Sequence, residues 1–91
     1  MGHQVFIWVG NGKDREGHQL VRQLDLVAET NLEAEPLGFP DCFGGKLLGA
    51  APELLHEIAS NDFVEVGFQS KRYKFTKLEP DGGFEVTKAW Q

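Results

Sequence analysis

The sequence predicts one α+β domain of 91 residues, a two-layer arrangement in which one or two helices cover a mainly antiparallel sheet of three to four strands. Three observations predict this fold class. The last third of the chain alternates apolar and polar residues in three short runs, which is typical of a meander over 63–90. Residues 4–9 are β-branched or aromatic, as in a strand. Pro52 precedes apolar residues at helical spacing, as in the first turn of a helix.

The N-terminal strand is apolar on both faces, because Phe6 and Trp8 alternate with three β-branched residues. Such a strand is either covered on both sides or shows its aromatic residues to a partner. The glycines of Gly10-Asn11-Gly12 predict a turn that ends it. The strand is expected to join the C-terminal meander, since an apolar edge strand would be an aggregation hazard.

Residues 17–30 can be interpreted in two ways. Their apolar residues cover an arc of roughly 120° on a helical projection, with Leu26 outside it. The alternative is a second strand, paired with the first through the turn at Asn11-Gly12. The helix is favoured, and its apolar face would consist of Leu20, Val21, Leu24, Val27 and Ala28.

Residues 31–51 are expected to form a long irregular loop that packs onto the core. Prolines and glycines interrupt any periodic pattern, at Pro36, Gly38, Pro40, Gly44, Gly45 and Gly49. The segment is nevertheless too apolar for a free linker, because it contains Leu32, Leu37, Phe39, Phe43, Leu47 and Leu48. Packed loops of this length are often functional.

A helix is expected to begin at Pro52 and to end at residues 60–62, where Ser, Asn and Asp follow one another. Its acidic first-turn residue, Glu53, suits the positive end of the helix dipole. The buried stripe would consist of Leu54, Leu55, Ile58 and Ala59.

The C-terminal meander is expected to contain strands at 63–68, 71–78 and 84–90. Two residues, 69–70, would connect the first pair, and the turn sequence at 80–83 would connect the second pair. The alternation is broken once, because Leu78 is out of phase with Phe75, which predicts a bulge or a strand end near Lys77.

Charge is unevenly distributed along the chain. Between Asp25 and Glu65 there are nine acidic residues and one basic residue, Lys46, whereas the whole chain carries −5. A concentrated acidic surface attracts basic proteins or cations. The alternative is that these carboxylates only keep the surface hydrated, since a net charge of this size is ordinary for a small domain.

The leading functional hypothesis is a small, non-catalytic protein-binding module that acts through the acidic segment 25–65. It would occlude a basic surface of a partner such as a nucleic-acid-handling enzyme, as an inhibitor or adaptor does, and phage- and plasmid-encoded inhibitors include small acidic proteins of this kind. A variant is a homodimer in which the acidic segment meets the basic residues of 71–77. The residues expected to bind the partner are Glu33, Glu35, Phe39, Asp41, Phe43, Glu53 and Glu57.

The alternative hypothesis is a nucleic-acid-binding module built on the strand at 71–77. Cations beside aromatic platforms bind single-stranded nucleic acids, and this strand also contains Tyr73 and Phe75. Strand alternation opposes this interpretation, because the two aromatic residues would face the core, and so does the sequence pI of about 5.0. The binding residues would be Lys71, Arg72, Lys74 and Lys77.

No catalytic, cofactor or metal site is predicted. Cys42 stands beside the negative charge of Asp41, which opposes a nucleophilic thiolate. The three histidines, His3, His18 and His56, do not stand at a zinc-ligand spacing.

Two further patterns are interpreted as structural. The glycine-rich segment followed by Lys13 fits neither of the common phosphate-binding motifs. The carboxylate pairs Glu33/Glu35 and Glu53/Glu57 lie among polar residues, as solvated pairs do, rather than in an apolar site suited to acid–base catalysis.

Four aromatic residues remain outside the clearly predicted core: Trp8, Phe39, Phe43 and Trp90. They either fill gaps between the sheet and its helices or anchor a partner. An exposed Trp8 would lie close to acidic residues, and an aromatic anchor within an acidic surface is a credible protein-binding site.

The compartment is predicted from what the chain contains. One cysteine in 91 residues suits a reducing environment, and no apolar run has the roughly 20 residues of a membrane-spanning helix. The protein is expected to be cytoplasmic and not to bind membranes.

Overall fold

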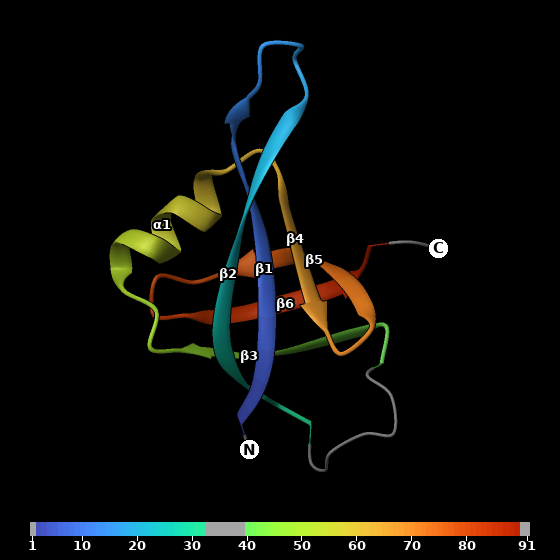
Figure 1. Ribbon diagram of the computed structural model, residues 1–91. Coiled ribbons are helices and arrows are strands. Elements are labelled where there is room, and N and C mark those ends of the chain that lie inside the picture. The colour runs from blue at the N-terminus through green and yellow to red at the C-terminus, as the bar shows by residue number, and fades with distance from the viewer. Residues whose placement is uncertain (1, 33–39, 90–91) are drawn as a thin grey trace.

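The computed structural model describes residues 2–32 and 40–89. Figure 1 shows their arrangement, in which the helix lies between the third and fourth strands of the chain. The elements are β1 (Gly2–Lys13), β2 (Gln19–Thr30), β3 (Cys42–Leu48), α1 (Pro52–Ser60), β4 (Val64–Phe68), β5 (Lys71–Leu78) and β6 (Gly83–Lys88).

The six strands form a closed barrel with the order β1-β2-β3-β6-β5-β4, and every neighbouring pair is antiparallel. Strands β1 to β3 form one meander and β4 to β6 form another. Pairing of β1 with β4 and of β3 with β6 closes the two meanders into the barrel. The expectation of a small α+β fold with a mainly antiparallel sheet is thus confirmed, and β1 joins the C-terminal meander as expected. The sheet is larger than the predicted three to four strands and is closed on itself.

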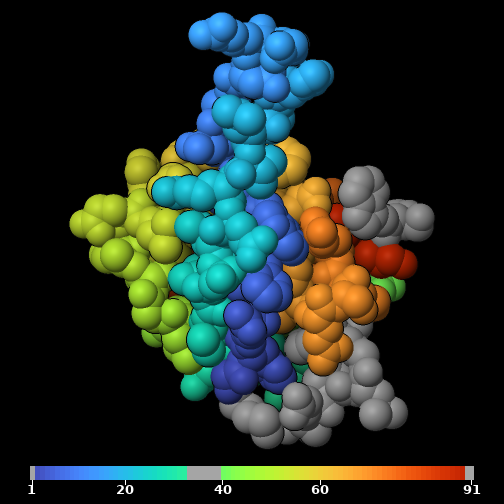
Figure 2. Space-filling model, in the orientation of Figure 1, coloured from blue at the N-terminus to red at the C-terminus, as the bar shows by residue number. Residues whose placement is uncertain are grey.

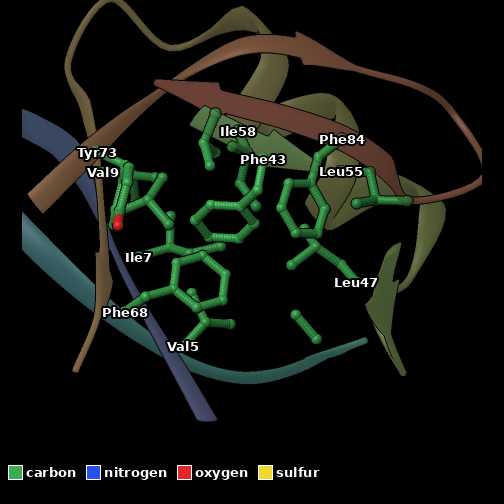
Figure 3. Packing of buried hydrophobic residues seen from close by; sticks show 13 residues of the cluster. Val5, Ile7, Val9, Phe43, Leu47, Leu55, Ile58, Phe68, Tyr73 and Phe84 are labelled. Carbon is green, nitrogen blue, oxygen red and sulfur yellow. The ribbon is translucent and has the colours of Figure 1, made fainter. Parts of the chain in front are cut away.

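The core fills the inside of the barrel. Val5, Ile7 and Val9 of β1 are fully buried, and α1 contributes Leu55 and Ile58 to the same cluster. Figure 3 shows these side chains converging on a group of aromatic rings from four different strands. Those rings are Phe43, Phe68, Tyr73 and Phe84, and several of their contacts are edge-to-face.

The prediction of a helix at 17–30 is wrong, because this segment forms β2. Leu24 and Leu26 lie opposite Ile7 and Val5 of β1, so their side chains share the inner face of the barrel. Val27, which the helical arc would have buried, is 46% exposed. The long-range pairing with β1 outweighs the local helical period.

The prediction that the first strand ends at Gly10-Asn11-Gly12 is also wrong. β1 continues to Lys13, with a register irregularity between Gly10 and Lys13. The turn lies farther along, where the Asp14 carboxylate accepts backbone N–H groups of Glu16 and His18 at 3.0 and 2.8 Å.

The β1–β2 hairpin extends beyond the barrel. β4 pairs with β1 no farther than Val9, and β3 pairs with β2 only at Val27–Thr30. Residues 10–22 therefore form a two-stranded ribbon, called here the arm, which projects at the top of Figure 2.

The expected loop at 31–51 is in part a strand. Phe43 and Leu47 pack on the core as predicted, but they do so from β3 rather than from irregular chain. Gly45 permits the close approach of β3 to β2, because a Cβ there would overlap the carbonyl oxygen of Glu29. Residues 33–39 lie outside the described part of the chain.

The remaining elements follow the sequence closely. α1 begins at Pro52, and β4, β5 and β6 occupy the three predicted runs with the short connection at 69–70. The register of β5 against β6 shifts between Phe75 and Lys77, as the broken alternation predicted. Within the described residues, no helix is long and apolar enough to span a membrane.

Candidate functional site

The predicted binding residues of the acidic loop are only partly covered by the structure. Glu33, Glu35 and Phe39 lie outside the described residues. Asp41 is exposed, and its carboxylate lies 3.1 Å from the Nζ atom of Lys71. This acidic residue is therefore compensated by a base from the predicted basic strand.

Phe43 occupies a different position from the one expected of a binding residue. Its side chain is 8% exposed and packs edge-to-face against Phe68 and Tyr73, with ring centroids 4.9 and 5.2 Å away. Phe43 is thus a core residue, and it is not part of an exposed surface.

The two predicted residues of α1 are exposed. Glu53 lies in the first turn of the helix, and Glu57 forms an ion pair with Arg22 at the base of the arm. Glu53, by contrast, makes no ion pair among the described residues.

Three bases of the predicted nucleic-acid-binding strand make ion pairs with acids of the same chain. Besides the Lys71–Asp41 pair, Arg72 lies 3.2 Å from Glu65 and Lys77 lies 3.2 Å from Glu79. The hydrogen bond and charge of Glu79 raise the pKa of Lys77 above its ordinary 10.5. Lys74 is exposed and has no ion pair among the described residues.

The alternation of the strand also separates its bases from its aromatic residues. Tyr73 is fully buried, and Phe75 packs against the core cluster, whereas Arg72 and Lys74 are exposed. The platform of aromatic residues and cations required by the alternative hypothesis does not form on this strand alone.

The structure instead brings aromatic and charged side chains together on the outer wall of the barrel, around Trp8. Because the β-branched residues of β1 face inward, Phe6 and Trp8 face outward, with ring centroids 6.1 Å apart. We call the surrounding surface the Trp8 patch; it consists of Phe6, Trp8, Gln23, Asp25, Glu65 and Arg72.

Strand register explains why these residues meet. Trp8 lies opposite Gln23 of β2 on one side and opposite Glu65 of β4 on the other. Phe6 is flanked in the same way by Asp25 and Gly67. Figure 1 shows the three strands β2, β1 and β4 side by side.

The orientation of the Trp8 indole is fixed by three contacts. Its Nε1 atom donates a hydrogen bond to Oε1 of Gln23 at 3.1 Å. The ring lies over Gly67, where a Cβ atom would be only 2.7 Å from the indole Cη2. The guanidinium carbon of Arg72 lies 3.9 Å from the ring centroid, within the range of a cation–π interaction.

The Trp8 patch carries two acids and one base. Glu65 pairs with Arg72, and Asp25 accepts a hydrogen bond from Gln23 at 2.9 Å. Asp25 and Glu65 are the two ends of the acidic segment recognised in the sequence, which the barrel brings onto one wall. The sequence pointed to Trp8, because its strand is apolar on both faces. It did not predict which residues lie around Trp8, because these come from other strands.

The turn of the arm brings three potential metal ligands together. Ligand atoms of Asp14, Glu16 and His18 lie within 4.8 Å of one another. The Asp14 carboxylate already accepts two backbone N–H groups and lies 3.2 Å from His18 Nδ1. These contacts give the side chains of Asp14 and His18 a structural role in closing the turn.

The side chain of Cys42 lies on the outer wall of β3. Its Sγ atom lies 3.5 Å from Oγ1 of Thr87, and both residues line a surface groove of about 450 Å³ between β3 and β6. Among the described residues, no histidine or basic side chain makes a hydrogen bond with this thiol. The described lining of the groove contains one ionisable side chain besides the thiol, the carboxylate of Glu85.

Comparison with protein-family models, with curated proteins and with solved structures finds no match to this chain.

Proposed function

We propose that the protein is a non-catalytic protein-binding module, an inhibitor or adaptor, that binds a basic surface of its partner through the Trp8 patch. The observation that carries the proposal is the stacking of Arg72 on the outward-facing indole of Trp8, with Glu65 opposite Trp8 on β4 and Asp25 opposite the neighbouring Phe6 on β2. Tryptophan and arginine are the residues most enriched at the energetic centres of protein interfaces.

Preorganisation supports the proposal. The indole is held by Gln23, Gly67 and Arg72 before any partner arrives, so little side-chain entropy remains to be lost on binding. Trp8 contributes nothing to the barrel core, because the core lies on the other face of β1.

Charge supports a basic partner. Asp25 and Glu65 border the aromatic pair, and the chain as a whole carries −5. Long-range attraction of this kind speeds encounter with a cationic surface and weakens as salt is added.

The nucleic-acid alternative receives less support. Lys71, Arg72 and Lys77 already pair with acids of the same chain, and each phosphate contact would have to compete with one of these pairs. This alternative predicts that charge reversal at Lys74 weakens binding more than Trp8→Ala or Asp25→Lys does.

The experiment is capture from a lysate of the source organism on the immobilised protein, after nuclease treatment and at low and high salt. The wild type is expected to retain a discrete protein that is released at high salt. Trp8→Ala is expected to reduce its recovery at least about tenfold, which corresponds to about 1.4 kcal/mol. Gly67→Ala should act in the same direction without removing any patch side chain, because its Cβ would displace the indole.

A matched pair of charge reversals provides the control. Asp25→Lys is expected to weaken capture, whereas Glu85→Lys, the same change of sign on an exposed outward residue of β6, is expected to leave it unchanged. Equal capture by Trp8→Ala and the wild type would refute the proposal. Recovery of nucleic acid alone, sensitive to Lys74→Glu, would favour the alternative.

A further inference from the structure

One edge of β2 has no strand beside it over much of its length. β3 pairs with β2 at Val27–Thr30, and no other described strand pairs with that edge from Gln19 to Leu26. Figure 1 shows β2 running past the end of β3 toward the arm. An exposed strand edge is a template for pairing with another extended chain.

The direction of the backbone groups along this edge follows from one hydrogen bond. The N–H of Asn31 donates to the Gly44 carbonyl oxygen at 2.9 Å, so residue 31 directs its backbone groups toward β3. The register against β1 is regular from Glu29 to Val21, and the direction alternates from residue to residue. Val21, Gln23 and Asp25 therefore direct their N–H and C=O groups to the edge that lacks a strand.

Exposed apolar side chains lie on this unpaired stretch, at Leu20 and Val21, and just beyond it, where β3 begins to pair with β2. Among the described residues, four large hydrophobic side chains expose 36 to 46% of their surface. Three lie on β2 itself, and the fourth lies on β3 opposite Val27. They are Leu20, Val21, Val27 and Leu48.

Charge along this edge favours a cationic occupant. Asp25 is exposed, and Figure 1 shows α1 beside β2 on the side away from β1. Arg22, the basic residue here, already pairs with Glu57. An added strand would thus meet Val21 and the carboxylate of Asp25, which makes no ion pair among the described residues.

We propose that the partner binds by strand addition: an extended segment in which apolar and basic residues alternate pairs with Val21, Gln23 and Asp25 at the edge of β2. This inference rests on the proposed function and names the chemistry of the partner. It also connects the two surfaces, because Gln23 and Asp25 belong to the Trp8 patch and an added strand would lie directly beside them. Strand addition gives affinity through backbone bonds and specificity through alternate side chains.

The test uses a synthetic octapeptide of alternating valine and lysine, with an alternating valine–glutamate octapeptide as the charge control. Amide hydrogen exchange of the 91-residue protein is followed by NMR while peptide is added. The valine–lysine peptide is expected to slow exchange at Val21, Gln23 and Asp25 at least about tenfold at saturation, and the valine–glutamate peptide is expected to have no effect.

N-methylation of the peptide provides a second measurement that leaves the protein unchanged. Methyl groups on one alternate set of peptide amides are expected to abolish protection, whereas methyl groups on the other set, which point away from β2, are expected to preserve it. Equal effects of both sets would overturn strand pairing.

The remaining outcomes separate this inference from the proposed function. Peptide-induced shifts at Trp8 without protection of the edge, or no binding, would overturn strand addition and leave the Trp8 patch to be tested by capture. Protection without peptide that grows with protein concentration would assign the edge to a second copy of the chain and overturn the partner named here.

Discussion

Gly45 shows how a single residue decides whether the barrel closes. A Cβ at this position would overlap backbone atoms of Glu29 on the neighbouring strand, and backbone cannot move aside as a flexible side chain can. We expect Gly45→Ala to destabilise the protein by about 3 kcal/mol. Urea denaturation measures this change.

Gly83→Ala is the control for that substitution. Its Cβ would lie 3.1 Å from the end of the Asp81 side chain, which can move, so the expected cost is about 1 kcal/mol or less. Equal destabilisation by the two variants would contradict the steric account of β3.

Tyr73 makes the stability of the folded protein depend on pH. Its hydroxyl donates to the Pro40 carbonyl oxygen at 2.8 Å, and burial, with the nearby charge of Asp41, raises its pKa from 10.0 to about 12. In the unfolded chain the phenol ionises near its ordinary pKa, whereas the folded protein keeps it neutral. The stability that Tyr73 provides is therefore fully present below pH 10 and is lost as the pH rises from about 10 to about 12.

The comparison that isolates this effect is between wild type and Tyr73→Phe. The variant loses the hydroxyl hydrogen bond and is expected to be about 1 kcal/mol less stable at neutral pH. This difference should shrink between pH 10 and pH 12, because only the wild type contains an ionisable ring. A constant difference over that range, measured by urea denaturation, would show that the Tyr73 hydroxyl is not held neutral by the fold.

At the scale of elements, Asn61 fastens the end of α1 to β1. Its side-chain oxygen accepts the N–H groups of Gly10 and Phe63 at 3.2 and 3.1 Å, and its amide donates to the Gly10 carbonyl oxygen at 2.9 Å. These bonds imitate a strand pairing at the base of the arm, beyond the last residue of β1 that pairs with β4.

Asn61→Ala is expected to destabilise the protein by about 2 kcal/mol, since three partly buried hydrogen bonds are lost. Exchange of arm amides should accelerate more than exchange of core amides. Asn11→Ala, at an exposed position of the arm, serves as the control and is expected to change stability by less than about 0.5 kcal/mol. An arm whose exchange is unaffected by Asn61→Ala would contradict this fastening role.

The sequence predicted those elements whose signals are local. Pro52 at the start of α1, the short connection at 69–70 and the bulge near Lys77 all follow from neighbouring residues, and the structure confirms them. β2 was assigned to a helix because five of its apolar residues also fit a helical arc. Leu26, the residue outside that arc, is the one whose packing against the core distinguishes strand from helix.

For the whole molecule, closure of the barrel is what the sequence did not predict. The pairing of β1 with β4 and of β3 with β6 joins segments that are distant along the chain, and no local pattern encodes it. The same closure brings Asp25 and Glu65 to opposite sides of the aromatic residues of β1. The Trp8 patch is therefore a product of topology, although the outward position of Trp8 could be inferred from alternation.

The most direct measurement of the central claim is an NMR titration of the labelled protein with the captured partner. The indole N–H resonance of Trp8, assigned by its absence in Trp8→Phe, is expected to shift together with amides of Gln23, Glu65 and Gly67. Shifts confined to the β3–β6 wall around Thr87, or to Lys74 on the outer face of β5, with an unchanged Trp8 resonance, would contradict the account.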